Sequence, residues 1–261
     1  MRAQKERVVL ITGGSSGIGF AMAKQMVAQQ AATEATVIVC GRSQEKLDGV
    51  KRKVPQLVTI QCDLTRQEDR NALCDKIAQE FNGLNMLINN AGIVQRYDLA
   101  KPGDIEDRIV AEWQTNFMAP VLLCNRLMPI LARNKGAIVN VTSGLVHIPL
   151  SIQPNYCATK AALHSMTQSM RVALSKQGVK VVEIFYPAVD TPFQEGRAPV
   201  TAITADEAAA IALKELNKGK DEIHVKMAAF LFLLSRLMPK RALYLFNKLF
   251  TEKGAEKRNS G

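Results

Sequence analysis

The stretch "TGGSSGIG" (Thr12–Gly19) directly follows the apolar run "VVLI" of residues 8–11. Glycine reaches backbone conformations that other residues avoid, so its repetition predicts a tight turn between a strand and a helix. The free N–H groups at a helix start attract phosphate. Such a turn can exist without a ligand, but its place between a buried strand and a helix favours a pyrophosphate-binding turn.

Short apolar runs alternate with helical segments along most of the chain. Runs that are apolar throughout suit a sheet covered on both faces. Seven strands are expected, at 8–11, 36–40, 57–63, 85–90, 137–142, 180–185 and 222–225. This alternation predicts an α/β fold: a single Rossmann-like domain with a doubly wound, mainly parallel seven-stranded sheet and helices on both faces.

Composition limits the classes of partner. The chain has 261 residues, 47% of them hydrophobic, and a formal net charge of +10. A basic balance suits nucleic acid, an anionic membrane or an anionic cofactor. No nucleic-acid-binding motif is present, so no nucleic-acid partner is expected.

The five cysteines form no CxxC pair, and several stand in apolar surroundings. We therefore expect small buried thiols and a reduced, cytoplasmic location. The apolar run after the first residues is too short for a signal peptide, and no run approaches the roughly 18 apolar residues of a membrane span.

Tyr156 and Lys160 stand four residues apart in "YCATK", a spacing that places both on one face of a helix. An unperturbed tyrosine has a pKa of about 10, and a nearby ammonium group lowers that pKa. A hydroxyl such as that of Ser143 can hold a substrate oxygen by a hydrogen bond. An isolated pair of this kind is more simply a coincidence on a surface helix, so its meaning depends on the other motifs.

The sequence resembles the short-chain dehydrogenase/reductase family over about residues 7–225. Five elements occur in the family's order: "TGGSSGIG", "NNAG" at 89–92, Asn116, Ser143 and "YCATK". Within the family, "CGRS", "NFMAPV", "VTSGL", "YCATKAALHS" and "VDT" resemble the DltE-like oxidoreductases, which are encoded with the D-alanyl–teichoic acid genes of Gram-positive bacteria.

This resemblance implies hydride transfer between a nicotinamide cofactor and a small-molecule carbonyl or alcohol substrate, with no metal ion. It assigns proton transfer to Tyr156, the substrate oxygen to Ser143, the nicotinamide ribose to Lys160 and a water-linked proton relay to Asn116. It also suggests a homodimer or homotetramer. One alternative is a nucleotide-binding scaffold without turnover, against which the complete set of four residues argues. The other is a peripheral membrane protein on the same fold, with its C-terminal tail as the main working surface.

The cofactor is expected to be NADP(H). Gly41 stands where NAD-preferring members of the family carry Asp, and Arg42 follows it. A guanidinium offers a planar fork of donors to a 2′-phosphate, with Ser43 as a further contact; a solvated loop arginine is the alternative. The other expected cofactor contacts are Gly13, Ser15, Ser16, Gly17, Ile18, Gly19, Asp63, Leu64, Asn90, Ala91, Gly92, Val189 and Thr191, besides Tyr156 and Lys160.

The chain departs from the family pattern after the sixth strand, where Tyr186 and Pro187 stand in place of the usual Pro and Gly. Tyr186 is therefore a candidate for the substrate side. His147 is a weaker candidate substrate contact, and His164 is expected to be structural. The resemblance implies that residues 192–203 form a substrate lid. Arg197 in this region could meet an anionic substrate, although a solvated side chain is the simpler interpretation.

Residues 1–225 are expected to form the dinucleotide-binding catalytic domain, and 226–261 a C-terminal apolar and basic helical extension of it. Pro239 is expected to break the extension into two helices. Apolar helices beside basic residues can lie on an anionic membrane surface, which would make a lipid-like substrate more plausible. The alternatives are packing on the core, covering of the substrate pocket and a subunit interface.

Overall fold

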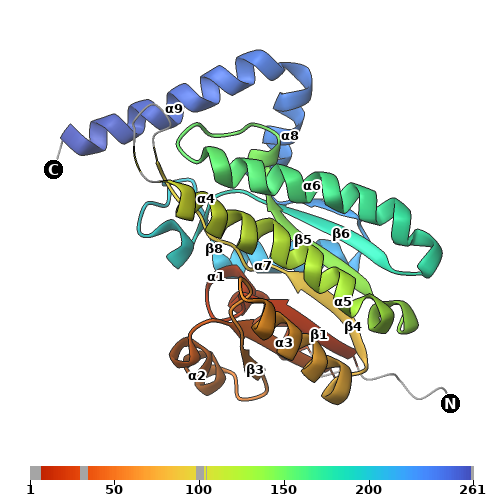
Figure 1. Ribbon diagram of the computed structural model, residues 1–261. Helices are drawn as coiled ribbons and strands as arrows, with labels where there is room; N and C mark the ends of the chain where they lie inside the picture. The colour runs from red at the N-terminus through yellow and green to blue at the C-terminus, as the bar shows by residue number, and fades with distance from the viewer. Residues whose placement is uncertain (1–6, 30–34, 98–102, 104, 260–261) are drawn as a thin grey trace.

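The computed structural model describes residues 7–29, 35–97, 103 and 105–259 (Figure 1). Its centre is a seven-stranded sheet in the order β3-β2-β1-β4-β5-β6-β9, in which every neighbouring pair is parallel. The strands are β1 (Arg7–Thr12), β2 (Ala35–Gly41), β3 (Val58–Gln61), β4 (Leu84–Asn89), β5 (Ala137–Ser143), β6 (Lys180–Tyr186) and β9 (Glu222–His224). The predicted Rossmann-like fold is confirmed.

Helices cover both faces of the sheet, because the buried strands present apolar side chains on both sides. The main helices are α1 (Gly17–Ala28), α2 (Gln44–Lys53), α3 (Gln67–Glu80), α4 (Glu106–Trp113), α5 (Ala119–Arg133), α6 (Pro154–Leu174) and α7 (Ala205–Asn217). One buried cluster joins the sheet to α1, α2 and α7, and a second joins it to α3 and α5. Removal of this apolar surface from water is the main stabilising contribution.

The strand order reverses between β1 and β4, which are neighbours although β2 and β3 separate them in the chain. In doubly wound sheets, ligands bind outside the carboxyl ends of the strands at such a reversal. The glycine turn, the segment after β4 and Ser143 all lie at this edge.

Several short elements shape the same edge. A five-residue π-helical turn, η2 (Gln114–Met118), joins α4 to α5, and a 3-10 turn, η3 (Gly144–Val146), follows β5. Between β6 and α7 the chain forms β7 (Val189–Asp190), η5 (Pro192–Gln194) and β8 (Ile203–Thr204). Another 3-10 turn, η4 (Ser175–Gln177), ends α6. Neither η2 nor the β7–β8 pair was predicted.

The C-terminal part forms two helices, α8 (Met227–Leu237) and α9 (Pro239–Asn259), which meet at Pro239 as predicted. Helix α8 contacts η3, β6 and β9, while α9 extends along the upper edge of the molecule (Figure 1). Among the described helices, none has the length and apolar character that crossing a bilayer requires.

Candidate active site

A cleft of about 2030 Å³ opens at the carboxyl edge of the sheet. It brings together predicted residues that are far apart in the sequence. Those that line it are Gly13, Ser15, Ser16, Gly17, Ile18, Arg42, Ser43, Asp63, Leu64, Asn90, Ala91, Gly92, Ser143, Tyr156, Lys160, Val189 and Thr191. Gly19 and Asn116 are not among the lining residues.

The glycine turn is fixed against the segment that follows β4. Gly13 has φ +66°, and a Cβ there would lie 2.8 Å from the Cα of Ala91. The hydroxyl of Thr12 accepts hydrogen bonds from the N–H groups of Asn90 and Ala91, both at 3.0 Å. This role of Thr12 was not predicted from the sequence. A Cβ at Gly19 would lie 2.4 Å from Nδ2 of Asn90, so Gly19 provides close packing behind the turn rather than cleft surface.

The start of α1 fits a phosphate group. Ser16 is the N-cap residue, but its side chain makes no capping hydrogen bond, and the first turn carries no acidic residue. The first N–H groups of a helix need partners from outside it, and they favour negative charge. Since Ser16, Gly17 and Ile18 line the cleft, a pyrophosphate suits this position.

The end of β2 supplies positive charge to the other side of the cleft. Arg42 is exposed, and its carbonyl accepts a hydrogen bond from Nε2 of Gln61 at 3.0 Å. Ser43 caps α2, because its hydroxyl accepts the N–H of Lys46 at 3.2 Å. Lys46 also lines the cleft, which the sequence reasoning did not identify. Gly41 is needed beside Ser15, whose Oγ would lie 2.9 Å from a Cβ at position 41.

Asp63 combines a place in the cleft with a local structural role. Its Oδ1 accepts the N–H of Thr65 at 2.9 Å and the hydroxyl of Thr65 at 2.8 Å. Burial raises the pKa of Asp63, but these hydrogen bonds, together with Arg42 and Arg66, outweigh it and hold the pKa below its usual value. The carboxylate therefore stays ionised at neutral pH.

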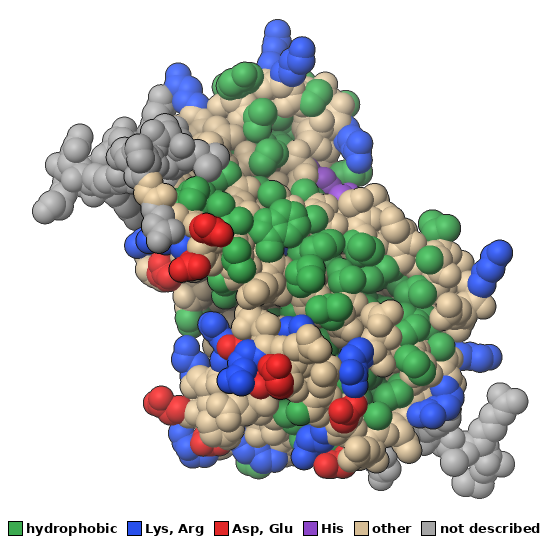
Figure 2. Space-filling view, in the orientation of Figure 1, with side chains coloured by type: hydrophobic (Ala, Val, Ile, Leu, Met, Phe, Trp, Pro, Cys, Tyr) green, Lys and Arg blue, Asp and Glu red, His purple; other side chains and the backbone are tan. Residues whose placement is uncertain are grey.

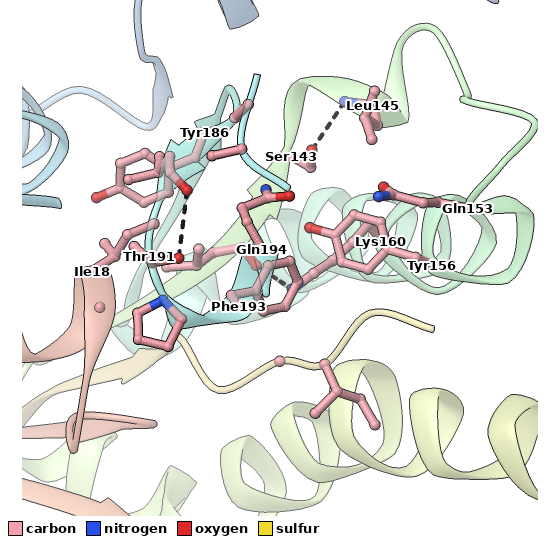
Figure 3. Close-up of a pocket in the computed structure, with 18 of the residues that line it drawn as sticks. Ile18, Ser143, Leu145, Gln153, Tyr156, Lys160, Tyr186, Thr191, Phe193 and Gln194 are labelled. Atoms are coloured by element: carbon pink, nitrogen blue, oxygen red, sulfur yellow. Dashed lines mark hydrogen bonds between the residues drawn. The ribbon is translucent and has the colours of Figure 1, made fainter. Parts of the chain in front are cut away.

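Tyr156 and Ser143 face the same space in the cleft (Figure 3). Ser143 ends β5, where its hydroxyl accepts the N–H of Leu145 at 3.1 Å. Tyr156 lies in the first turn of α6 with its ring 5.7 Å from that of Phe193, edge to face. Burial raises the pKa of Tyr156, and a hydrogen bond with Ser143 opposes the rise. The phenol is therefore protonated at neutral pH.

Lys160 lies one helical turn after Tyr156, and its side chain is 3% exposed. Its Nζ donates to the carbonyl of Val141 at 2.9 Å and stands 5.9 Å from the Tyr156 ring centre. Burial lowers the pKa of Lys160 to about 8, while Glu183 acts in the opposite direction. The expectation of a lowered pKa for Tyr156 is wrong for this structure, because burial of the phenol raises it.

Asn116 is fully buried in the π-helical turn η2. Its Oδ1 accepts the N–H of Ile93 at 2.9 Å, and its Nδ2 donates to the Ile93 carbonyl at 2.9 Å and to the Thr159 hydroxyl at 3.1 Å. A Cβ at Gly92 would lie 3.3 Å from Oδ1 of Asn116 and 3.6 Å from Nζ of Lys160. The side chain of Asn116 therefore ties the segment after β4 to α6. π-Helical turns of this kind are frequent at functional sites.

A buried carboxylate that no motif indicated supports the start of α6. Glu112 accepts the N–H of Gln95 at 2.6 Å and the side-chain amide of Asn155. Trp113 Nε1 donates to Oδ1 of Asn155 at 2.9 Å. Burial raises the pKa of Glu112. Because Asn155 directly precedes Tyr156, these contacts fix the backbone from which the phenol projects.

The part of the cleft beyond Tyr156 is largely apolar. Its apolar lining includes Leu145, Leu150, Ile152, Phe193, Leu231 and Phe246. Polar groups occur on one side, where Arg96 Nη2 donates to Oε1 of Gln194 at 3.3 Å. Arg197 also lines the cleft, and it is an exposed side chain whose guanidinium lies 3.7 Å from the Glu195 carboxylate.

Of the two candidate substrate contacts, Tyr186 lines the cleft and His147 does not. The Tyr186 hydroxyl points away from Tyr156 (Figure 3) and donates to Sδ of Met22 at 3.7 Å. His147 lies outside the cleft lining, with its ring 5.1 Å from those of Phe185 and Phe232. The structural role of His164 is confirmed by its Nδ1, 2.9 Å from Oε2 of the buried Glu183.

His147 gives a pH-dependent prediction for stability. Its Nε2 is buried without a partner among the described residues, and burial, with the nearby histidines, lowers its pKa to about 4 from 6.5. The unfolded chain therefore binds the proton first, so His147 costs stability as pH falls from 6.5 towards 4. We expect the free energy of unfolding of His147→Phe, relative to the parent, to rise by about 1–2 kcal/mol between pH 7.5 and pH 5, after allowance for partial exposure of the ring.

Urea unfolding of both proteins at the two pH values measures this difference. His164, whose pKa Glu183 raises, and His224, whose pKa burial lowers, are present in both proteins, so their own contributions largely cancel in the comparison. If the free energy of unfolding changed equally with pH in the parent and in His147→Phe, His147 would not titrate as its burial indicates.

Comparison with known proteins finds relatives that are all described as dehydrogenases, reductases or oxidoreductases. Residues 7–200 match the family model described as short chain dehydrogenase. The chain is 40% identical over 223 residues to an uncharacterized oxidoreductase of Bacillus subtilis, DltE, covering 82% of this chain and 86% of that protein. It is 32% identical over 210 residues to a fatty acyl-CoA reductase of Mycobacterium tuberculosis, covering 77% and 70%.

Solved structures agree in fold. A short chain dehydrogenase from Burkholderia cenocepacia in complex with NADP superposes with a TM-score of 0.80 at 26% identity, covering 94% of this chain and 98% of the other. A short-chain dehydrogenase from Sphingobium yanoikuyae in complex with NADPH gives 0.75 at 26% identity, covering 84% and 87%.

Proposed function

The chain belongs to the short-chain dehydrogenase/reductase family, and on this basis we propose that it is an NADP(H)-dependent oxidoreductase that interconverts a carbonyl and an alcohol. The family predicted from the sequence is thereby confirmed, as is the likeness to DltE. The observation that carries the proposal is the meeting of Ser143, Tyr156 and Lys160 in one cleft with the glycine turn.

NADP(H) suits the polar half of the cleft, and when bound it supplies or accepts a hydride. The N–H groups at the start of α1 would hold the pyrophosphate, and Arg42 with Lys46 the 2′-phosphate. Lys160 would hold the nicotinamide ribose. Val189 and Thr191 would contact the carboxamide. Two family members of known structure, 26% identical to this chain, hold NADPH or NADP in the same fold.

Tyr156 acts as the acid or base in this proposal. Its raised pKa keeps the phenol protonated, which is the form that donates to a carbonyl oxygen during reduction. Ser143 holds the same oxygen by a hydrogen bond. Lys160 places a positive charge near the phenolate that forms, and Asn116 fixes the backbone around both residues.

The substrate class we propose is an apolar, lipid-like carbonyl compound. The apolar lining beyond Tyr156 supports this, because a cleft that removes apolar surface from water favours an apolar ligand. The fatty acyl-CoA reductase of M. tuberculosis, 32% identical to this chain, has a name consistent with such a substrate.

We also propose a homodimer or homotetramer in the cytoplasm. Val110, Met118 and Leu122 are large apolar side chains that are 44%, 47% and 36% exposed along α4, η2 and α5, and apolar side chains gather over this side of the molecule (Figure 2). Contiguous exposed apolar surface favours a protein interface.

All five cysteines are buried free thiols, which suits a reducing compartment. We retain residues 1–225 as the catalytic domain and 226–261 as its extension.

Calorimetric titration of the purified chain with NADPH and with NADH tests the cofactor assignment. We expect NADPH to bind at least about 10-fold more tightly, since a charge-assisted hydrogen bond contributes about 1.5–3 kcal/mol. NADPH oxidation with long-chain aldehydes and ketones then tests turnover. Absence of binding by either nucleotide would overturn the enzyme assignment in favour of a scaffold on the same fold.

A further inference from the structure

Helix α8 exposes an apolar stripe. Phe230, Leu233 and Leu237 are 56%, 54% and 70% exposed, and their spacing puts them on one face of the helix. Leu231, in the same helix, is 4% exposed, and its Cδ1 would lie 3.1 Å from a Cβ at Gly144. The opposite face of α8 is therefore held against the residue that follows Ser143.

Helix α9 continues this apolar surface. Tyr244, Leu245 and Leu249 are 76%, 58% and 56% exposed, while Ala242 is buried against α8. Asn247 fastens the helix to the loop after η3, since its Nδ2 donates to the Pro149 carbonyl at 2.9 Å. We call six of the exposed apolar side chains of α8 and α9 the tail surface: Phe230, Leu233, Leu237, Tyr244, Leu245 and Leu249.

The charged residues within positions 226–250 have a single sign. Between residues 226 and 250 the sequence contains five basic residues and no acidic one. The five, all exposed, are Lys226, Arg236, Lys240, Arg241 and Lys248. Lys226 forms an ion pair with Glu207 of α7. In Figure 2, Lys and Arg side chains stand at the margin of the upper part of the molecule, with apolar side chains between them.

This combination indicates an anionic lipid surface as the partner. An interfacial helix buries its apolar face at the headgroup boundary, while its Lys and Arg side chains meet anionic lipids. A second copy of the chain is a poorer occupant, because a symmetric contact through this surface would bring two sets of positive charges together.

The tail surface is continuous with the cleft. Phe230 and Leu249 belong to both, and Met227, Leu231, Phe246 and Phe250 extend the apolar lining from the tail into the cleft. A bilayer that covered the tail surface would therefore adjoin the cleft on its substrate side. An apolar compound dissolved in that bilayer could reach Tyr156 without crossing water.

We propose that the tail surface docks on an anionic lipid bilayer and admits an apolar substrate from it into the cleft. The docking step stands on the surface alone, and only the substrate step rests on the proposed function.

Co-sedimentation of the full chain with vesicles tests the docking step. We expect binding to vesicles of 30% phosphatidylglycerol in phosphatidylcholine, and at least about 10-fold weaker binding to phosphatidylcholine alone or at high salt. Lys240→Glu with Arg241→Glu should weaken binding at least about 10-fold, since each surface cation contributes about fivefold. Leu233→Ser with Leu245→Ser should also weaken it without touching the cleft lining.

The control is Arg52→Glu with Lys53→Glu, which makes the same charge change at an exposed position on α2 and should change binding by less than about threefold. Equal losses in the control and the tail variant would overturn docking through α8–α9. So would equal binding to neutral vesicles, or no binding at all. Sedimentation velocity identifies the remaining case, since self-association lost in the Leu233→Ser, Leu245→Ser variant without vesicle binding would assign the surface to a second copy.

NADPH calorimetry on the same variants separates the two proposals. Vesicle binding without NADPH binding would leave docking in place and remove the enzyme, whereas the reverse would remove docking alone. If both hold, the Lys240→Glu, Arg241→Glu variant should lose at least about fivefold in turnover of a vesicle-embedded long-chain aldehyde. It should keep its turnover of a short soluble one. Equal turnover of the embedded aldehyde by parent and variant would overturn the substrate step.

Discussion

Tyr156→Phe is expected to lower kcat about 1,000-fold while leaving NADPH affinity within about twofold. The change removes one oxygen atom and keeps the ring that packs edge to face on Phe193 at 5.7 Å. Proton transfer to the substrate oxygen then loses its donor, whereas the start of α1 and Arg42 are unchanged. Single-turnover NADPH oxidation measures the loss, and calorimetry measures the retained affinity.

Tyr186→Phe is a matched control, because it removes the same atom from a tyrosine whose hydroxyl points away from Tyr156 towards Met22. We expect its kcat to change by less than about threefold. Retention of a tenth or more of the parent kcat in Tyr156→Phe would mean that another group supplies the proton. An equal loss in both variants would point to packing rather than to chemistry.

Arg42→Gln is expected to weaken NADPH binding about 10- to 100-fold and to leave NADH binding unchanged, because the guanidinium meets only the cofactor that carries a 2′-phosphate. Lys46 lies beside it in the cleft and should account for the binding that remains. Titration calorimetry with both nucleotides gives the two dissociation constants. The ratio of the two dissociation constants decides the test, since a general loss of folding would weaken the binding of both nucleotides.

Arg52→Gln removes the same charge from an exposed position on α2 outside the cleft, and should leave both constants unchanged. If the two variants lost similar amounts of NADPH affinity, Arg42 would contribute only general electrostatic attraction. If Arg42→Gln weakened the binding of NADPH and NADH equally, the guanidinium would contact a part of the nucleotide that both cofactors share.

The sheet could be predicted because its strands are continuous apolar runs, and burial on both faces requires that pattern. The glycine turn could be predicted because Gly13 and Gly17 adopt positive φ, which other residues rarely do. Asn116 was found only through the family resemblance. The π-helical turn that holds it has no periodic signature of its own.

Contacts between distant segments could not be read in the same way. Glu112 and Asn155 are 43 residues apart and meet only once α4 and α6 are packed. The direction of the Tyr186 hydroxyl could not be predicted, because the alternation along β6 does not tell which face of the sheet its last residue meets. The Tyr156 pKa was misjudged because the i, i+4 spacing reveals the neighbouring charge but not the depth of burial.

The hydrogen bonds between Thr12 and the Asn90–Ala91 segment connect parts of the chain that lie 78 and 79 residues apart. During translation, residues 12–19 therefore leave the ribosome long before the segment that completes their turn. Closing so long a loop costs conformational entropy, and parallel strand pairing between distant segments forms slowly. A nascent chain that ends before β4 contains all the glycines of the phosphate turn. It lacks the Asn90–Ala91 segment that holds this turn in place, so cofactor binding cannot guide its early folding.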